Sequence, residues 1–393
     1  MGLRMSETEA INKYVEEIYC CTRCGTCKYI YQVYDPSCPA GVKFRFETFY
    51  PSGKIHIARG LIEGKIEWSE RIRDIIFACP TCANCTIQCQ SRHHAQIVEI
   101  IEALRADAVS KGFGPLPNQK AFADSVKKEH NPYKEKHSDR IKWAKNLAIP
   151  QKDKAEILYF VGCTSSYRQQ SLAQKTVEIL NKLGVDYIVS SDEWCCGSPL
   201  IRTGQLEQVS QLINHNLDLI KSLGVKTVIT SCAGCYRTLK MDYPKYTDKL
   251  DGIEFLHITE FLQQFISKKK LKFKKGKEFK VTYHDPCHLG RHSNIYEEPR
   301  AVLNAIPGLK LIEMPRNREN AWCCGAGGGV KAGYKEWAVE IASDRIHEAE
   351  QINAEILTSA CPFCKTNLQD AINETNSNIK FMDIVELLNE VII

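Results

Sequence analysis

The chain has 393 residues, 44% of them hydrophobic and 25% charged, which suits two or three globular domains with cores of their own. Its formal charge of +5 is small, and no apolar run approaches the roughly 18 residues that a membrane-spanning helix needs. The nineteen cysteines are far above ordinary usage and carry most of the functional argument.

Three kinds of chemistry compete to explain the cysteines. A disulfide scaffold is typical of secreted proteins, but the N-terminal sequence MGLRMSETEA lacks the apolar core of a secretory signal, and the cysteine count is odd. Zinc sites take four ligands each. Iron–sulfur clusters take thiolates from tight Cys-x-x-Cys runs, which this sequence contains. We therefore predict a cytoplasmic iron–sulfur protein whose membrane association, if any, is made through a partner subunit.

The distribution of cysteines divides the chain into four segments. Residues 1–110 hold nine cysteines and are predicted to form a helical domain. Residues 111–153 hold none and are rich in Lys, Pro, Gly and His, as is typical of a linker. Residues 154–270 and 271–393 hold five cysteines each and are predicted to be separate domains.

The first segment contains two runs of three closely spaced cysteines, each with a fourth cysteine further along. In two-cluster ferredoxins, three cysteines of one run hold a [4Fe-4S] cubane and the other run supplies the fourth ligand. The sequence therefore predicts two cubanes. The first would be held by Cys21, Cys24, Cys27 and Cys89, and the second by Cys79, Cys82, Cys85 and Cys38.

Several details of this segment fall outside the ferredoxin pattern. Gln90 follows Cys89 where ferredoxins usually have Pro, which weakens the assignment of the fourth ligand but not the prediction of the clusters. Cys20 is left over and is predicted to be a small buried hydrophobic residue. His93 and His94 are predicted to lie at a solvated helix start, and a match to a myristoylation pattern at Gly2 is attributed to chance.

The rest of the chain contains one pattern twice: a single Cys, then Cys-Cys-Gly, then Cys-x-x-Cys. Equivalent cysteines are 124 to 129 residues apart, which is too regular to be accidental. The first copy consists of Cys163, Cys195, Cys196, Cys232 and Cys235, and the second of Cys287, Cys323, Cys324, Cys361 and Cys364.

Secondary-structure signals repeat together with the cysteines. Short apolar runs typical of buried strands alternate with helical patterns, which favours a parallel sheet with helices outside it. The first copy predicts strands over 156–161, 185–190 and 225–230 and helices over 169–184 and 205–224. The second predicts strands over 279–284, 309–314 and 354–359 and helices over 301–306 and 334–351. Each copy is thus a Rossmann-like β-α-β-α-β unit.

The cysteines of each copy follow its strands. Because ligands of open parallel sheets bind beyond the carboxyl ends of the strands, five distant cysteines should converge on one edge. Two adjacent cysteines cannot easily both bind one tetrahedral metal ion, but they can hold neighbouring irons of a larger cluster. We predict that Gly197, Gly325 and the glycines up to Gly329 allow the backbone to approach the inorganic core.

These motifs carry a family resemblance. The five-cysteine pattern, present twice, is the signature of the CCG domain, and the whole chain from about residue 18 to 390 resembles the D subunit of heterodisulfide reductase. The resemblance implies an α/β protein with an N-terminal helical two-cluster ferredoxin-like domain followed by two CCG domains. It also implies an oxidoreductase component of electron transport in anaerobic metabolism.

The resemblance implies a mechanism as well. In catalytic members, each CCG domain binds a non-cubane four-iron cluster through its five cysteines, and the two clusters flank a disulfide. Each cluster takes one sulfur as the bond is reductively cleaved, so the catalytic cysteines would include Cys195, Cys196, Cys323 and Cys324. Both copies keep all five cysteines, which favours a catalytic member, although one CCG site in some relatives holds zinc.

Alternatives remain open at this stage. The chain could be a non-catalytic electron-transfer subunit of an aromatic acyl-CoA reductase, or of a hydroxyacid or glycerol-3-phosphate dehydrogenase. A zinc-stabilised interaction protein is a third class. The expected partners are an electron-donor subunit, either a membrane cytochrome b or a soluble hydrogenase or flavoprotein, and a thiol or disulfide substrate. We expect no nucleic-acid partner, because clusters of about −2 each would offset the positive charge.

Two other features have both a functional and a structural interpretation. His284 or His288, on either side of Cys287, could donate a proton to a leaving thiolate or tune a cluster, although hydrogen bonding that holds the loop is the commoner role. The lysine-rich segment 267–280 could bind an acidic partner or an anionic membrane, but a solvated linker between the repeats is the simpler interpretation.

Overall fold

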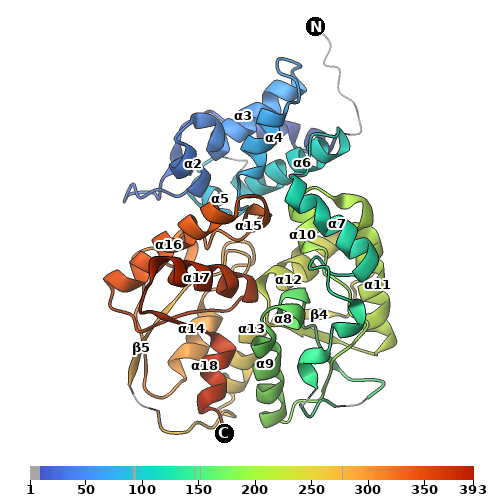
Figure 1. Ribbon diagram of the computed structural model, residues 1–393, viewed down its shortest axis with the longest axis vertical. Coiled ribbons are helices and arrows are strands. Elements are labelled where there is room, and N and C mark those ends of the chain that lie inside the picture. The colour runs from blue at the N-terminus through green and yellow to red at the C-terminus, as the bar shows by residue number, and fades with distance from the viewer. Residues whose placement is uncertain (1–8, 92–93, 146, 151, 277) are drawn as a thin grey trace.

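The structure is a computed structural model with three parts, two repeats side by side and an N-terminal domain across one end of both (Figure 1). We call residues 154–270 the first repeat and 271–393 the second repeat. The described residues are 9–91, 94–145, 147–150, 152–276 and 278–393. Gly2 and His93, discussed above, therefore lie outside them.

The N-terminal domain is helical, as predicted, and its cysteine runs lie largely between the α-helices, with Cys85 inside α5 (Asn84–Gln88). The other α-helices are α1 (Val15–Tyr19), α2 (Pro39–Phe44), α3 (Pro51–Ile62), α4 (Glu70–Phe77) and α6 (Ile97–Ser110). Helix α4 begins at a Ser69 cap, whose hydroxyl accepts the Ile72 N–H at 3.3 Å, and α3 begins with Pro51 in its first turn. Buried isoleucines such as Ile55 and Ile76 form the core between these helices.

Residues 111–153, expected as a linker, contain helix α7 (Pro117–Glu129). This helix contacts α10 (Ser198–Arg202) of the first repeat and α15 (Val330–Gly333) of the second. Buried Arg140 lies further along the same segment. The segment therefore connects the domains and also forms part of the structure around the first repeat.

The first repeat is built on a four-stranded parallel sheet with the order β2-β1-β3-β4. The strands are β1 (Ile157–Tyr159), β2 (Tyr187–Ile188), β3 (Thr227–Thr230) and β4 (Glu254–His257). The remaining helices are α8 (Cys163–Tyr167), α9 (Gln170–Lys182), α11 (Val209–Ser222), α12 (Ala233–Arg237) and α13 (Ile258–Ser267).

The second repeat has the same parallel arrangement, with the order β6-β5-β7-β8. The strands are β5 (Phe279–Tyr283), β6 (Leu309–Leu311), β7 (Ile356–Ser359) and β8 (Lys380–Asp383). The remaining helices are α14 (Glu297–Asn304), α16 (Lys335–Gln351), α17 (Pro362–Thr375) and α18 (Ile384–Val391). The predicted α/β class and the two Rossmann-like units are thus confirmed.

Each repeat also has a fourth strand and a last helix that the β-α-β-α-β pattern did not include. Strands β4 and β8 run into α13 and α18 without an intervening glycine or proline. Instead, the last residue of each strand caps the helix, since the His257 ring accepts the Thr259 N–H and the Asp383 carboxylate accepts the Val385 N–H. Because no turn residue marks them, the boundaries between β4 and α13 and between β8 and α18 could not be predicted from the sequence.

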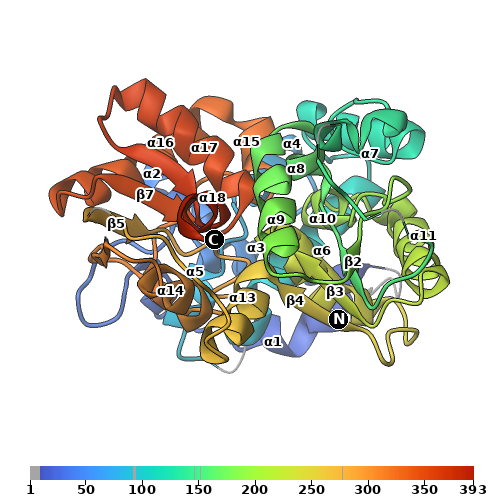
Figure 2. The ribbon, with the colours of Figure 1, turned by 90° about the horizontal axis from the view of Figure 1, so that it is seen from below.

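The two repeats meet through equivalent helices (Figure 2). Helix α9 contacts α18, and α13 contacts α14. The contact has polar links such as Asn389 Nδ2 to Glu178 Oε2 at 2.7 Å, and one continuous hydrophobic core runs through both repeats. The described lysines of segment 267–280 are exposed, and the segment pairs with the C-terminus through a bridge between Phe273 and Ile392. No helix within the described ranges is both long and apolar enough to cross a membrane.

Candidate iron–sulfur centres

The first group of cysteines, which we call the surface site, consists of Cys21, Cys24, Cys27 and Cys89. The four thiols line one small cavity in the N-terminal domain. Cys24 is exposed and the other three are buried. A hydrogen bond from Thr26 lowers the pKa of Cys24, whereas burial raises the pKa of Cys27 to about 11. The site therefore has one side open to solvent.

The second group, which we call the inner site, consists of Cys38, Cys79, Cys82 and Cys85. Burial raises the pKa of Cys85 well above its ordinary value, and the neighbouring charges of the other three cysteines raise it further. Burial likewise raises the pKa of Cys38 to about 12, against the lowering effect of the Lys54 ammonium. Lys54 is 1% exposed and donates to the Phe49 carbonyl. Two buried and two partly buried thiols beside one buried cation suit an anionic metal cluster.

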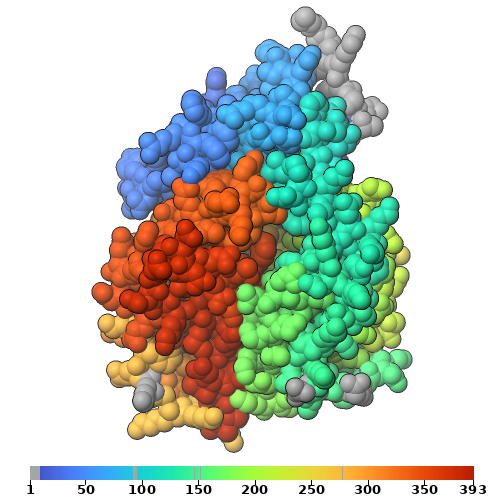
Figure 3. Space-filling view, in the orientation of Figure 1, coloured from blue at the N-terminus to red at the C-terminus, as the bar shows by residue number. Residues whose placement is uncertain are grey.

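The cysteines of the two repeats surround one cavity of about 250 Å³. Figure 3 shows the hollow between the orange part of the second repeat and the teal segment that contains α7. The strand order places this cavity beyond the carboxyl ends of β1 and β3 and of β5 and β7, as expected for parallel sheets. Its lining includes Cys163, Cys195, Cys196, Cys232, Cys235, Cys287, Cys324, Cys361 and Cys364.

The cysteines of the two repeats also contact each other. A hydrogen bond joins the thiols of Cys232 and Cys361, which hold the same position in their repeats. None of the described cysteines is joined in a disulfide bond. The donor chemistry and the shared cavity therefore fit metal clusters at two adjoining sites, which we call the first-repeat site and the second-repeat site.

The first-repeat site is covered by the segment that follows α7. Arg140 places Nη2 3.4 Å from the Cys163 sulfur and Nη1 2.7 Å from Glu193 Oε1. Glu193 also accepts the backbone N–H groups of Val161 and Gly162 at 2.8 and 2.9 Å. The buried ion pair thus fixes the loop that presents Cys163. Sequence analysis missed both residues, because neither belongs to a cysteine motif.

The second-repeat site is covered by the N-terminal domain instead. Cys323, the one cysteine of the repeats outside the cavity lining, forms a hydrogen bond with the inner-site thiol Cys82. That bond, followed by the positive charge of Arg291, lowers the pKa of Cys82. Arg291 Nε also donates to the Cys82 carbonyl at 2.6 Å. The inner site and the second-repeat site therefore adjoin.

The glycines after the adjacent cysteines have a clear structural role. Gly197 and Gly325 have φ angles of +91° and +79°, which side chains rarely adopt. Their N–H groups point to the sulfurs of Cys195 and Cys323 at 3.4 and 3.3 Å. Each glycine therefore closes a turn that donates a hydrogen bond to a predicted ligand.

The later glycines of the second repeat allow close contact with the N-terminal domain. A Cβ atom on Gly327 or Gly328 would lie 2.6 or 2.5 Å from the backbone oxygens of Pro80 and Cys79. The glycine run thus allows close approach of the N-terminal domain, where the sequence suggested approach of an inorganic core.

Arg105 in α6 joins all three parts of the molecule. Its fully buried guanidinium donates to the carbonyls of Arg202 at 2.6 Å, Gly328 at 2.8 Å and Cys79 at 2.6 Å. These acceptors belong to the first repeat, the second repeat and the inner-site run. Such long-range contacts leave no signature in the local sequence.

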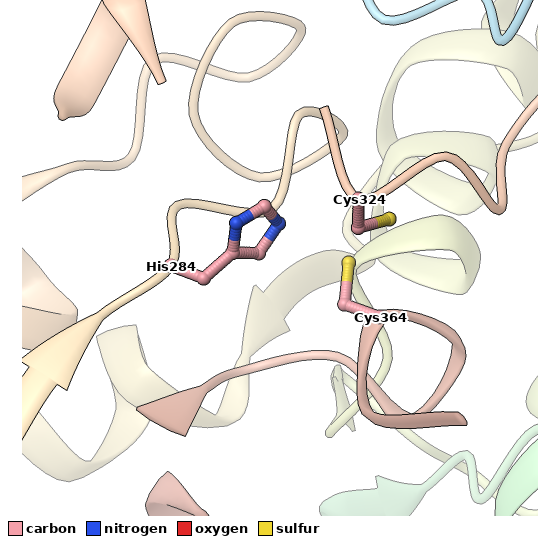
Figure 4. Close-up of side chains that lie close together, drawn as sticks. All are labelled: His284, Cys324 and Cys364. Atoms are coloured by element: carbon pink, nitrogen blue, oxygen red, sulfur yellow. The ribbon is translucent and has the colours of Figure 1, made fainter. Parts of the chain in front are cut away.

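The histidines near Cys287 lie in different places. His284 lies with Cys324 and Cys364, with all ligand atoms within 4.8 Å of one another (Figure 4). His288 lines the cavity, and its Nε2 is 3.4 Å from Arg237 Nη1. Burial and the charge of Arg237 lower the pKa of His288 well below its ordinary value, so its ring is neutral at pH 7.

Comparison with known proteins agrees with this arrangement. Residues 17–92 match the 4Fe-4S dicluster domain, and residues 157–240 and 281–369 match the cysteine-rich domain. Among solved structures, a hypothetical protein from Helicobacter pylori aligns with 97% of this chain and 72% of its own, with a TM-score of 0.53 and 13% identity. That likeness shows a shared fold alone.

Relatives at higher identity are components of oxidoreductases. The D subunit of the dihydromethanophenazine:CoB–CoM heterodisulfide reductase of Methanosarcina barkeri is 41% identical over 95% of this chain and 94% of its own length. The B subunit of the CoM/CoB fumarate reductase of Methanothermobacter marburgensis is 32% identical over 99% of this chain and 77% of its own. The EtfAB:quinone oxidoreductase of Syntrophomonas wolfei is 32% identical over 80% of this chain and 46% of its own. The chain therefore belongs to the iron–sulfur oxidoreductase family that includes the D subunit of heterodisulfide reductase.

Proposed function

We propose that this protein is the disulfide-reducing subunit of an iron–sulfur oxidoreductase, with two [4Fe-4S] cubanes and two non-cubane four-iron clusters. The observation that carries the proposal is the single cavity lined by cysteines of both repeats. The surface and inner sites hold the cubanes, and each repeat holds one non-cubane cluster through its five cysteines. Clusters bound in these sites supply electrons one at a time.

The order of the sites suggests a route for the electrons. The surface site has an exposed cysteine, the inner site has none, and the inner-site residue Cys82 contacts Cys323 of the second repeat. Cys232 and Cys361 then link the two repeats. Electrons thus enter at the surface site, pass through the inner site and reach the second repeat before the first.

The cavity binds the substrate between the repeats. Cleavage of a disulfide R–S–S–R′ consumes two electrons and two protons and releases two thiols, so both repeats must contribute. Arg202 and Lys331 on the wall are paired with the carboxylates of Asp242 and Asp370. Because its ring is neutral, His288 can hold the loop or donate a hydrogen bond from its N–H group. It cannot act as an imidazolium that gives up a proton.

The electron donor is proposed to be another subunit that docks beside the surface site. Residues 29–46 expose several large apolar side chains there, and Lys28 and Glu47 pair across the adjoining loops. The most exposed are Tyr31 at 65%, Val33 at 61%, Tyr34 at 79% and Phe46 at 68%. Aromatic patches of this kind are typical of interfaces. A membrane cytochrome b, a hydrogenase or a flavoprotein would fit, and the chain itself would be cytoplasmic.

An electron conduit without substrate is the second candidate. The relatives named for fumarate or quinone reactions favour it, because they join the same cysteine-rich architecture to other chemistry. In such a protein, the cavity would hold only clusters, and electrons would pass to a further subunit.

An anaerobic assay with a reduced dye and a panel of disulfides separates the two functions. Our proposal predicts cleavage of at least one disulfide, with two electrons consumed for each molecule. Transfer of electrons to a partner without cleavage of any disulfide would instead support the conduit. Metal analysis should give about sixteen irons per chain, and eight irons plus zinc would contradict the assignment of two four-iron clusters to the repeats.

A further inference from the structure

His284 is held in place by its backbone. It directly follows β5, its N–H donates to the Thr358 carbonyl at 2.8 Å, and its own carbonyl accepts the Ser359 hydroxyl at 2.9 Å. Its side chain is 1% exposed. The imidazole therefore occupies a fixed position between the sheet and the cysteines of the second-repeat site.

One face of the imidazole receives a hydrogen bond from an arginine. Arg345 Nε lies 3.2 Å from His284 Nδ1, and Arg345 is itself held by Glu348 and by the Arg316 carbonyl at 2.7 Å. An arginine can only donate, so Nδ1 must accept. The neutral ring therefore carries its proton on Nε2.

The other face of the imidazole is turned toward sulfur. Figure 4 shows one ring nitrogen directed toward the side chains of Cys324 and Cys364. The ligand atoms of His284, Cys324 and Cys364 lie within 4.8 Å of one another, so the imidazole is close to both sulfurs. Since the ring proton is on Nε2, His284 can act as the donor of a hydrogen bond to the Cys324 sulfur.

The first repeat lacks this donor at the equivalent position. Phe160 stands 124 residues before His284 and makes the same backbone bond, with its N–H 2.8 Å from the Ile229 carbonyl. It is equally buried, but its ring has no polar atom. Asn216, which stands 129 residues before Arg345, donates to the Cys195 carbonyl at 3.2 Å.

We propose that His284 is a positioning residue that donates a hydrogen bond from its Nε2–H to the Cys324 sulfur and raises the reduction potential of the second-repeat site. A hydrogen bond to a ligand sulfur stabilises the more negative, reduced state of a cluster and raises its potential. The first-repeat site has Phe160 at this position, and one of its own sulfurs, Cys163, has Arg140 as a donor instead. This inference rests on the part of the proposed function that assigns redox clusters to both repeats, but not on disulfide cleavage.

The contacts between domains agree with a raised potential at the second-repeat site. The second repeat adjoins the inner site through Cys323 and Cys82, so it is the first of the two to receive an electron. A higher potential there draws the first electron into the cavity and holds it until a second arrives. The two repeats would then differ in role although they carry the same five cysteines.

The test replaces His284 with the residue of the other repeat. We expect His284→Phe to lower the midpoint potential of the second-repeat site and to leave that of the first-repeat site unchanged. Potentials are measured in anaerobic redox titrations followed by electron paramagnetic resonance, without any disulfide. The Cys196→Ser and Cys324→Ser variants, which each perturb one site, assign the signals.

Two further variants guard against a merely structural effect. His284→Gln keeps an N–H near the position of Nε2 and should recover much of the lost potential, whereas Phe160→Leu should change neither potential. An unchanged potential in His284→Phe would overturn the proposal, as would loss of iron from the second repeat in both His284 variants. Because no substrate is present, a protein that fails to cleave disulfides could still pass this test.

Discussion

The two repeats share their topology and their cysteines but not their surroundings. The first repeat is covered by the segment after α7, where Arg140 lies against Cys163. The second is covered by the N-terminal domain, where Cys82 lies against Cys323. A duplicated ligand set has thus been placed in two environments, and only one of them adjoins the inner site. Position relative to the N-terminal domain, rather than the cysteine motif, therefore distinguishes the two sites.

The largest expected effect is the loss of disulfide cleavage after a change at the equivalent cysteine of either repeat. Disulfide cleavage needs one electron from each side of the cavity, so Cys196→Ser or Cys324→Ser alone should abolish cleavage rather than halve it. We expect a loss of about a hundredfold or more, because the residues act as a unit. The measurement is the anaerobic dye assay, with spectra of the cubanes as the control. A variant that kept most of its activity would refute a mechanism that uses both repeats.

A change at the inner site should stop electrons from the natural donor before they reach either repeat. Cys82→Ser removes a proposed cubane ligand and the contact with Cys323. Electrons from the natural donor should then fail to reach either repeat, while a small reduced dye that enters the cavity should still reduce both. Stopped-flow spectroscopy with each reductant measures whether the sites in the two repeats are reduced.

Cys24→Ser is the matched variant at the surface site. It should block electrons from the same donor at an earlier step and also leave the sites in the repeats intact. If electrons from the donor still reached the cavity in either variant, they would have to enter by another route.

A change at Arg140 should affect the first repeat alone. Arg140→Met leaves Glu193 buried without its cation, and the loss of one partner of a buried pair costs roughly 3 to 5 kcal/mol. We expect a lower thermal unfolding temperature and weaker metal binding at the first-repeat site, with the second-repeat site unchanged. The double variant Arg140→Met with Glu193→Met should recover much of the stability. A single variant as stable as the parent would show that the pair does not hold the Cys163 loop.

The smallest expected effect concerns the exposed patch, which lies upstream of both repeats. Tyr34→Ser or Phe46→Ser should weaken binding of the electron donor by about 1 to 2 kcal/mol, or roughly tenfold, because exposed aromatic side chains are common binding anchors. Reduction by a small dye should not change. Leu206→Ser, at an exposed apolar residue of the first repeat, is the matched control. Equal effects of all three changes on donor binding would remove the argument for this surface.

Much of the fold could be predicted because it follows from local patterns in the sequence. The spacing of the three-cysteine runs indicated the ferredoxin-like domain, and the steady offsets between equivalent cysteines indicated a repeat. The alternation of apolar runs and helical patterns predicted the parallel sheets. Strands β4 and β8 were missed, since His257 and Asp383 end each strand and cap the next helix without a glycine or proline to mark the boundary.

The sequence by itself determined the chemistry of the sites, because cluster ligands must come from short, closely spaced motifs that survive in the linear order. Only the tertiary structure decided which site lies beside which. The contact between Cys82 and Cys323, the contact between Cys232 and Cys361 and the three-way anchor at Arg105 join residues far apart in the chain. Such contacts depend on how whole domains dock, and docking leaves no periodicity or spacing in the local sequence.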